Sequence, residues 1–432
     1  MPETPTSPTG KRPHVVVVGG GFGGIAAVRK LKRADVDVTL IDRHTYNTFN
    51  PLLYQVATAS LNPGDITWFL RAIRAKQRNV RFLKGILKSI DHEKRTLHLE
   101  GAVDVKFDYL VLACGVTTNF FGIPGAEEFS IPLYKRSQAL EVRDTMFANF
   151  EDAAINGQDR DLRIVVVGGG ATGVETAGAF AEMRNLDMPI TYPELDRERV
   201  HITLVEMMPT VLGPFHPKLQ RYALKSLQKR DVDLRLDTAV KEVREDGVLV
   251  EKGGEQEFLP AGIVVWASGV TTHPTVADWS VPQGRGGRIE TDEQRRVKGL
   301  DNVFAIGDVS IGPEELPQVA QPAIQGGKYV AKLIKADLKG KSRKPFKYLD
   351  KGIMATIGRA SAVAEIKFMP KLTGFPAWII WVALHIVTLL GNRNRFATLI
   401  NLSAKYLVWG SHNAIVGETP YVIAAKPFTV EA

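Results

Sequence analysis

Three glycines near the start of the chain have the spacing of a turn that binds a phosphate group. Gly19, Gly21 and Gly24 form the pattern G-x-G-x-x-G directly after the apolar run Val15–Val18. Where a strand turns into a helix, such glycines allow a sharp turn, leave room for a pyrophosphate and let the helix pack on the strand. The anion then meets free backbone N–H groups and the positive end of the helix dipole. The pattern therefore predicts a dinucleotide-binding turn.

A carboxylate follows at a separation that suits such a site. The segment Asp37–Asp42 has the composition of a second strand, and Asp42 stands 18 residues after Gly24. A carboxylate at this place accepts hydrogen bonds from the hydroxyls of a ribose. Taken alone, the glycines fit equally well with a tight strand-to-helix connection that binds nothing.

The second half of the chain repeats both features. Gly168, Gly170 and Gly173 have the same spacing after another apolar run, and Glu206 ends the next apolar strand. An acid there favours the free 2′-hydroxyl of NAD(H), because a carboxylate repels the 2′-phosphate of NADP(H). Gly173 and Glu206 are 33 residues apart because an insertion rich in proline and acidic residues lies at 185–199.

A third pair of similar segments supports an internal duplication. Tyr109–Asn119 resembles Ile263–His273, and both contain the sequence Gly-Val-Thr-Thr after an apolar strand. The three pairs occur in the same order and are displaced by 149, 164 and 154 residues, which makes chance similarity improbable. The sequence therefore predicts an α/β protein with two Rossmann-like dinucleotide-binding domains.

Composition narrows the class of protein. A chain of 432 residues suggests about three domain-sized units, and the net charge of +8 suits nucleic acid, an anionic membrane surface or phosphate-rich cofactors. The sequence has no zinc-ligand spacing and no RNA-binding signature, so nucleic acid is the least favoured partner and no metal is expected. Cys114 is the single cysteine, which excludes an internal disulfide and fits a reducing compartment. Ser268 stands at the equivalent position of the repeat, so Cys114 is interpreted as a packing residue.

Two further segments have residues that suit the lining of a site. The polar and aromatic loop 44–58 is one, although a connection packed in the core is the alternative interpretation. The other is the strand at 302–308, which ends in Gly307-Asp308 and precedes a helix that starts near Pro317. An aspartate there suits the ribityl chain of a flavin, with helix N–H groups facing the ring. We favour this over an ordinary helix cap, because two dinucleotide sites need a place for a flavin ring.

Glu175 has two interpretations. With Thr172 it forms Thr-x-x-Glu at the start of a helix, a capping box in which the carboxylate accepts a hydrogen bond from a free backbone N–H. Alternatively, it positions a nicotinamide or takes part in a proton relay to a quinone. The residues by themselves favour the cap.

The C-terminal tail differs in character, with no Lys, Arg, Asp or Glu from Leu372 to Asn392. A helix over 375–390 would be about 24 Å long, shorter than a hydrocarbon core of about 30 Å. Polar residues recur along one stripe of each of two segments: His385, Thr388 and Asn392, then Asn394, Thr398, Asn401 and Lys405. With Arg393 and Arg395 between them, these segments predict two amphipathic helices in the bilayer interface. The alternatives are a dimer interface or packing on the protein's own core.

Together these features resemble the type II NADH dehydrogenases, single-subunit NADH:quinone oxidoreductases that do not pump protons. The resemblance rests on both glycine motifs, Pro51–Thr58, Gly168–Glu175, Gly307-Asp308, Ala320–Gln325 and the apolar tail. It covers nearly the whole chain and is specific from residue 13 to about residue 359. It implies FAD in the first unit and NADH in the second, with hydride passing to FAD and two electrons to a membrane quinone.

The resemblance also implies which residues form the sites. The FAD site comprises Gly19, Gly20, Gly21, Phe22, Gly23, Gly24, Asp42, Arg43, Gln55, Ala113, Gly115, Asp308 and Ala320. The NADH site comprises Gly168, Gly170, Ala171, Thr172, Gly173, Glu206, Ser268 and Gly269. Glu175 is placed near the nicotinamide, against the capping interpretation, and Gln321 and Gln325 are placed at the quinone site.

The expected organisation follows from these assignments. A disordered leader occupies residues 1–12, an FAD-binding domain 13–120 and 280–350, an NADH-binding domain 121–279 and a membrane-association region 351–432. Expected partners are a membrane quinone and the bilayer surface, reached through C-terminal amphipathic helices, with a homodimer possible. The expected location is peripheral, on the cytoplasmic face of the cell membrane. Lys371 is a candidate quinone-site residue under the resemblance, and His385 is interpreted as structural rather than as a ligand.

Two other functions fit the residues less well. One is a soluble NADH-dependent flavoprotein reductase of another acceptor, and the other is a flavoprotein that senses NADH without catalysis. Disulfide reductases and sulfide:quinone oxidoreductases need reactive sulfurs, and a single cysteine does not supply a pair.

Overall fold

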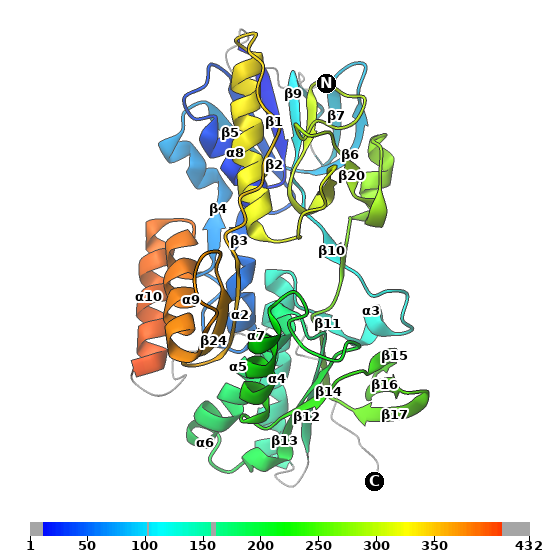
Figure 1. The fold of residues 1–432 in the computed structure, drawn as a ribbon, viewed down its shortest axis with the longest axis vertical. Coiled ribbons are helices and arrows are strands. Elements are labelled where there is room, and N and C mark those ends of the chain that lie inside the picture. Colours follow the sequence, from blue (N-terminus) through cyan, green and yellow to red (C-terminus); the bar gives the residue numbers. More distant parts are fainter. Residues whose placement is uncertain (1–11, 102, 157–160, 408–432) are drawn as a thin grey trace. The chain divides into compact units, whose positions relative to one another are not determined.

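The computed structural model describes residues 12–101, 103–156 and 161–407, so the predicted leader lies almost entirely outside the described residues. The chain forms two compact units. The first consists of Met1–Asn47, Trp68–Thr117 and Val270–Asp350, and the second of Thr48–Thr67, Thr118–Gly269 and Lys351–Ala432 (Figure 1). These boundaries differ from the predicted domains, because the segment 48–67 and the C-terminal tail both belong to the second unit.

The first unit is built on a sheet of five parallel strands in the order β21-β9-β1-β2-β5. They are β1 (His14–Val18), β2 (Asp37–Asp42), β5 (Val80–Lys84), β9 (Tyr109–Leu112) and β21 (Val303–Ala305). Every residue of β1 is buried, because a central parallel strand is covered on both faces. Figure 1 shows the long helix α8 (Ala320–Asp337) beside the sheet, where it packs against α1 (Phe22–Lys30).

Smaller elements complete this unit. The chain is interrupted at Gly85, so that the residues before it form β5 of the parallel sheet and the residues after it form β6. The antiparallel sheet comprises β6 (Ile86–Asp91), β7 (Thr96–Glu100) and β8 (Val105–Lys106), and β20 (Ile289–Glu290) pairs with β22 (Ser310–Ile311). Strand residues of the parallel sheet and of the antiparallel sheet share one core with the short helix η5 (Pro274–Trp279).

The second unit repeats this plan, which confirms the duplication and the α/β fold class. Its parallel sheet has the order β11-β18-β12-β13-β14. The strands are β11 (Ile131–Pro132), β12 (Leu162–Val167), β13 (Val200–Val205), β14 (Val232–Arg235) and β18 (Ile263–Trp266). A second antiparallel sheet contains β15 (Ala239–Arg244), β16 (Gly247–Lys252) and β17 (Glu255–Pro260).

Helices surround the second sheet. They are α2 (Leu53–Ala57), α3 (Ala126–Phe129), α4 (Arg136–Asn156), α5 (Ala171–Glu182), α6 (Met188–Thr191) and α7 (Pro217–Gln228). The loop expected at 44–58 includes α2, whose five residues are all buried. Burial of α2 agrees with a connection packed in the core, and the lining of a site by this segment stays a prediction.

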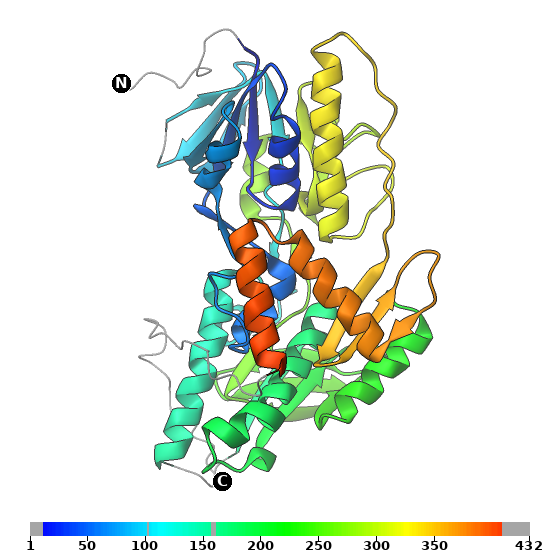
Figure 2. The ribbon, with the colours of Figure 1, turned by 90° about the vertical axis from the view of Figure 1, so that its left-hand side faces the viewer.

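The C-terminal tail forms a small sheet and two helices. These are β23 (Ile353–Gly358), β24 (Ser361–Glu365), β25 (Leu372–Thr373), α9 (Gly374–Thr388) and α10 (Asn392–Leu407). Figure 2 shows α9 and α10, in orange and red, on the near face. The sheet packs closely on α5, because a Cβ at Gly178 would lie 2.5 Å from the carbonyl oxygen of Ile357. Two short pairs remain: β3 (Tyr46–Thr48) with β4 (Thr67–Phe69), and β10 (Thr117–Thr118) with β19 (Val270–Thr271).

Among the residues that the structure describes, none of the helices combines the length and the apolar character needed to cross a bilayer.

Two adjacent glycines of α8 allow a test of its packing on α1. A Cβ at Gly327 would overlap the carbonyl oxygen of Gly23, whereas a Cβ at Gly326 would lie 3.6 Å from Ile306, an ordinary contact. We expect Gly327→Ala to lower the free energy of unfolding by about 1–3 kcal/mol, as overpacking does. Gly326→Ala should be neutral, or stabilising by up to about 1 kcal/mol through helix propensity. Urea unfolding followed by circular dichroism measures both, and equal effects would contradict the proposed packing.

Candidate functional site

The first glycine turn is shaped by close backbone contacts. Gly19 has φ of 108°, a conformation that favours glycine. A Cβ at Gly24 would overlap the carbonyl oxygen of Gly19, so α1 can start at this distance from β1 only without a side chain there. Gly20 and Gly23 are also enclosed by protein, next to Leu70 and Ala323. Gly19 and Gly24 are therefore required by the backbone of the fold, whereas Gly20 and Gly23 are closely packed against neighbouring groups.

Gly21 differs from its neighbours because the space beside it is open. The nearest described atom to a Cβ built there is the carbonyl oxygen of Ala113, at 4.0 Å. Gly21 is also the N-cap of α1, whose first turn has no acidic residue in the described chain. The free N–H groups of this helix therefore face a space that a Cβ at Gly21 would reduce, which suits an anionic group.

The acid at the end of β2 is anchored next to this turn. One oxygen of the Asp42 carboxylate accepts from the backbone N–H of Gly20 at 2.6 Å, and the other accepts from that of His44 at 2.7 Å. Burial raises the pKa of Asp42, while these two hydrogen bonds and the charge of Arg43 oppose the rise. The carboxylate is thus fixed in orientation and keeps lone pairs that can accept from hydroxyl groups.

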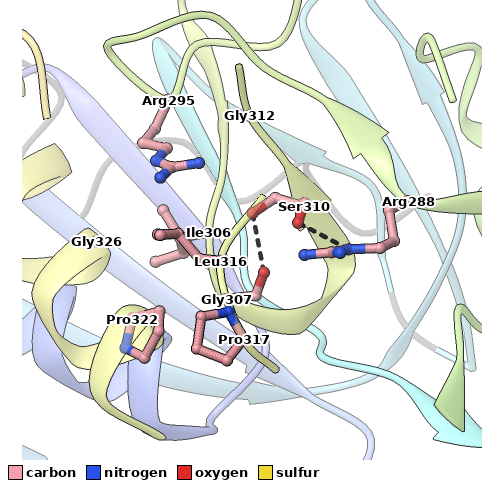
Figure 3. A pocket seen from close by; sticks show the side chains of 10 residues that line it. All are labelled: Arg288, Arg295, Ile306, Gly307, Ser310, Gly312, Leu316, Pro317, Pro322 and Gly326. Atoms are coloured by element: carbon pink, nitrogen blue, oxygen red, sulfur yellow. Dashed lines mark hydrogen bonds between the residues drawn. The ribbon is translucent and has the colours of Figure 1, made fainter. Parts of the chain in front are cut away.

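The first unit has a second acid, Asp308, in the turn that follows β21. Burial raises its pKa to about 6, and the charge of Arg288 opposes this. Figure 3 shows the pocket that lies around this turn, in which the guanidinium of Arg288 donates to the carbonyl oxygen of Ser310 at 3.0 Å. Ser310 in turn donates to the carbonyl oxygen of Gly307 at 2.9 Å. Arg288 therefore stabilises the turn and the charge of Asp308.

The predicted quinone residues lie at the start of α8. Ala320 is its first residue, and Gln321 follows. The side-chain amide of Gln325 donates to the backbone oxygen of Leu349 at 2.9 Å and accepts from its N–H at 3.0 Å. Gln325 is therefore held by Leu349, and its contact with Gln321 is long, at 3.5 Å.

The second glycine turn has the same construction. Gly168 has φ of 112°, and a Cβ at Gly173 would overlap the carbonyl oxygen of Gly168. At Gly170 no described atom lies within 4 Å of a built Cβ. Glu206 accepts from the backbone N–H of Gly169 at 2.5 Å and from that of Met208 at 2.8 Å. The open glycine, the helix start and the anchored acid thus occur twice.

The remaining predicted residues divide by unit. Phe22, Arg43, Ala113 and Gly115 belong to the first unit, with the glycine turn. Ala171 and Thr172 are exposed in the first turn of α5, and Ser268 and Gly269 follow β18. Gln55 also belongs to the second unit and is buried, with its Nε2 donating to the hydroxyl of Tyr54 at 2.8 Å. Its Oε1 has no hydrogen-bond partner within the described ranges.

The capping interpretation of Glu175 is wrong. The N-cap of α5 is Gly170, and no described side chain caps this helix. Glu175 points instead into the protein, where its carboxylate accepts from the backbone N–H of Thr356 in β23 at 3.2 Å. It is only 8% exposed. The sequence places Glu175 in the second turn of the predicted helix. It contains no signal that β23 and α9 cover this side chain.

Burial changes the protonation of Glu175. Loss of solvent raises its pKa to about 8, against the opposing effects of the Thr356 N–H and the nearby indole of Trp381. This carboxyl therefore holds a proton at neutral pH. A buried acid whose pKa lies near the working pH is suited to proton transfer.

The surroundings of Glu175 are aromatic. The Tyr54 ring lies 6.3 Å from that of Trp381, and His385 stacks on Trp381 at 4.0 Å. Burial lowers the pKa of His385 to about 4, so its ring is neutral, and its Nδ1 is 2.6 Å from the backbone oxygen of Trp381. His385 therefore has a packing role.

Sequence reasoning missed a polar group that fixes α10. Glu182 lies two turns after Glu175 on α5, and its carboxylate accepts from the backbone N–H of Arg359 at 2.6 Å. Lys405 of α10 lies 3.4 Å from Glu182 and also donates to Ser60. The spacing of seven residues between the two acids was the one available signal, since it places both on the same helix face.

Two features limit other chemistry. Burial raises the pKa of Cys114 to about 12, so its thiol is not a nucleophile at neutral pH. Within residues 12–101, 103–156 and 161–407, no three His, Cys, Asp or Glu side chains are grouped as metal ligands.

Comparison with known proteins agrees with this duplicated site. A family model described as "Pyridine nucleotide-disulphide oxidoreductase" matches residues 13–327. The match begins before β1 and ends within α8, so it includes both glycine turns.

The relatives are more specific. Type II NADH:quinone oxidoreductase NdhA of Mycobacterium tuberculosis is 38% identical over 91% of this chain and 87% of its own length. The type II NADH:quinone oxidoreductase of Staphylococcus aureus is 33% identical over 82% of this chain and 90% of its own. The chain belongs to the type II NADH:quinone oxidoreductases, within the pyridine nucleotide-disulphide oxidoreductase family.

A solved structure shows the same fold. NDH2 from Plasmodium falciparum, determined in complex with NADH, superimposes with a TM-score of 0.88. The superposition covers 94% of this chain and 100% of that chain, at 19% identity. At this identity the likeness concerns the fold.

The protonation of Glu175 predicts a pH effect on stability. Its pKa is about 8 in the folded chain and 4.5 in an exposed side chain, so the folded state binds the proton more tightly between these values. The stabilisation is complete below about pH 4.5 and is lost as the pH rises to about 8. Glu175→Gln cannot lose a proton, so its free energy of unfolding should gain on that of the wild type over this range. Urea unfolding at several pH values measures this, and parallel pH profiles would contradict the assignment.

Proposed function

We propose that this chain oxidises NADH through a bound FAD and passes two electrons to a membrane quinone. The proposal rests on one repeated feature in a chain of this family, which we call the cradle: the glycine turn between a strand and a helix, with the anchored acid beside it. In each cradle one glycine, Gly21 or Gly170, leaves an open space at the helix start. When bound, FAD accepts a hydride from NADH and delivers the electrons to the quinone. The protein supplies binding, orientation and proton transfer.

The first unit holds FAD in this proposal. Gly21 and the free N–H groups at the start of α1 would hold the pyrophosphate, and Asp42 would accept from the ribose hydroxyls. Asp308 accepts from the ribityl hydroxyls, a role that suits a carboxylate whose charge is stabilised by Arg288. Phe22, Arg43, Ala113, Gly115 and Ala320 are assigned to the remainder of this site, and the buried amide of Gln55, whose Oε1 has no described partner, is assigned to FAD as well.

The second unit holds NADH by the same contacts. Gly170 and the exposed first turn of α5 receive the pyrophosphate, and Glu206 accepts from the adenosine ribose. Both carboxylate oxygens of Glu206 are already fixed by backbone N–H groups. A 2′-phosphate would bring a second negative charge against this immobile one, so the site favours NADH over NADPH. Ser268 and Gly269 form the far edge.

Glu175, Gln321 and Gln325 serve the quinone. Reduction of a quinone consumes two protons, and Glu175 keeps one at neutral pH because it is buried. We assign it the role of proton donor. Gln321 binds the quinone head group, and Gln325 fixes the start of α8 through Leu349.

The arrangement of α10 supports the proposed membrane contact. Its polar stripe faces the protein: Asn394 donates to the backbone oxygen of Thr67 at 2.6 Å and Asn401 to the carboxylate of Asp65 at 2.7 Å. The apolar residues face outward instead. Phe396 is 65% exposed and Ile400 64% exposed. A helix with this polarity is suited to a bilayer surface.

The side of the membrane is proposed to be the cytoplasmic one, because a chain with a single cysteine fits a reducing compartment. The homodimer stays a prediction.

The catalytic proposal predicts two optical changes in the purified protein. Under anaerobic conditions NADH should bleach the flavin absorbance rapidly, and a water-soluble quinone should restore it. Stopped-flow spectroscopy follows both steps. A colourless protein that cannot be reconstituted with FAD would contradict the proposal, and slow turnover with every quinone would favour a sensor.

The open glycine of the second cradle predicts a selective loss of NADH binding. A methyl group at Gly170 meets no protein atom within 4 Å, so Gly170→Ala should leave the thermal midpoint and the FAD content unchanged. It should raise the KM for NADH about tenfold or more, because it removes the close approach of pyrophosphate to backbone. Gly21→Ala is the matched change and should release FAD instead. Unchanged KM and FAD content in the two variants would argue against both assignments.

The outward face of α10 predicts the membrane contact. Phe396→Asp should weaken flotation with vesicles of phosphatidylcholine and phosphatidylglycerol, since a charge replaces an apolar side chain in the bilayer interface. NADH oxidation by a water-soluble quinone should be unchanged. Ile155→Asp is the control, because Ile155 is 77% exposed on α4. Equal flotation of the two variants would show that α10 does not contact lipid.

A further inference from the structure

The loop between β24 and β25 presents an apolar tip that the proposed function does not use. We call the five residues Lys367–Lys371 the β24–β25 tip, and all five are exposed. Phe368 is 95% exposed and Met369 is 45% exposed. Figure 2 shows this loop, in orange, extending from its sheet beside α9. Exposure of a phenylalanine and an adjacent methionine to water is unfavourable in free energy. Transfer of the tip to an apolar environment would therefore be favourable.

The backbone keeps the phenylalanine at the apex. Phe368 has φ of 67°, in the left-handed region, which is unfavourable for a bulky side chain. The ammonium group of Lys367 lies 5.4 Å from the centre of the Phe368 ring. The conformation thus displays an aromatic ring with a cation beside it.

The sequence from the tip to the end of α10 has charge of one sign. From Ile366 to Leu407 the sequence has five basic residues and no acidic residue. Lys367 and Lys371 flank the tip, and Lys371 lies 3.8 Å from the carboxylate of Glu365, which precedes it. Basic residues beside exposed apolar ones are complementary to an anionic lipid surface.

The tip is continuous with the proposed membrane face. β25 has two residues, Leu372 and Thr373, and α9 begins directly after it. Phe375 in the first turn of α9 is 58% exposed and stacks on Trp378 at 5.9 Å. Tip and helix therefore present apolar rings within a short stretch of one unit.

We propose that the β24–β25 tip is a separate membrane contact, in which Phe368 and Met369 enter the bilayer interface and the two lysines bind anionic headgroups. The inference rests on the proposed membrane association. The short strand β25 joins the tip to α9. The second unit would then contact the membrane at two places, the tip and the helices, and this would restrict its tilt.

A fluorescent probe tests the position of the tip. Phe368→Cys carries an environment-sensitive dye in the full-length holoenzyme, and Cys114 reacts little because burial raises its pKa to about 12. Vesicles of phosphatidylcholine and phosphatidylglycerol should shift the emission to the blue, and nitroxide-labelled acyl chains should quench it. The same dye on Ile155→Cys should show neither change. Equal behaviour of the two positions would overturn the inference.

Binding measurements test its energetic contribution. Phe368→Ser should weaken vesicle binding about tenfold, through loss of the buried ring. Lys367→Gln should weaken it about fivefold on anionic vesicles and hardly at all on pure phosphatidylcholine. Ile155→Ser should have no effect. FAD content and the reduction of a water-soluble quinone should be unchanged in all three variants.

The outcomes separate this inference from the proposed function. If the wild type floats and Phe368→Ser floats equally well, the tip is not a contact, while the function and the α10 contact stand. If Phe368→Ser instead changes the sedimentation of lipid-free protein, the tip binds a second copy and the inference fails. If no quinone is reduced at all, the proposed function fails regardless of what the tip binds.

Discussion

The structure depends on the close approach of a helix start to the end of a buried strand. Gly24 and Gly173 have no side chain because a Cβ at either place would overlap the carbonyl oxygen of Gly19 or Gly168. This approach brings free N–H groups of α1 and α5 to the edge of each sheet, where Asp42 and Glu206 are anchored. The enclosed glycines make the turn possible, and the open ones leave space for a ligand. Under the proposed function, one backbone arrangement thus serves folding and binding through different residues of the same motif.

A second dependence is the burial of a carboxyl group. Glu175 lies on α5 only a few residues after the open turn, yet β23 and α9 remove it from water. The cost of a buried charge is relieved by retaining a proton, since desolvation is the largest influence on the pKa. The C-terminal tail therefore sets the protonation of Glu175, because the segments that form the outward apolar surface also enclose this acid.

The tail reverses the usual relation between polarity and exposure. In a soluble protein the polar stripe of a surface helix faces water. In α10 the polar stripe hydrogen-bonds to the loop that follows α2, and Lys405 joins it to α5 through Glu182. Hydrogen bonds orient the helix so that its apolar residues remain outside. The same unit also exposes the β24–β25 tip. The apolar face of α10 and the apolar tip are both suited to a lipid surface.

The sequence by itself determined the two sheets, their glycine turns and the acids at the strand ends, because these depend on local steric rules and on a repeat that can be read along the chain. It also located both tail helices from the spacing of their polar residues. Only the tertiary structure decided which face of α10 is outward, that Glu175 is enclosed and not a cap, and that the segment 48–67 joins the second unit. These depend on contacts such as those of Glu175 with Thr356 and of Asn394 with Thr67, between residues more than 150 positions apart. Local propensity contains no information about such pairs, since burial and pKa are set by whatever the rest of the chain brings against a side chain.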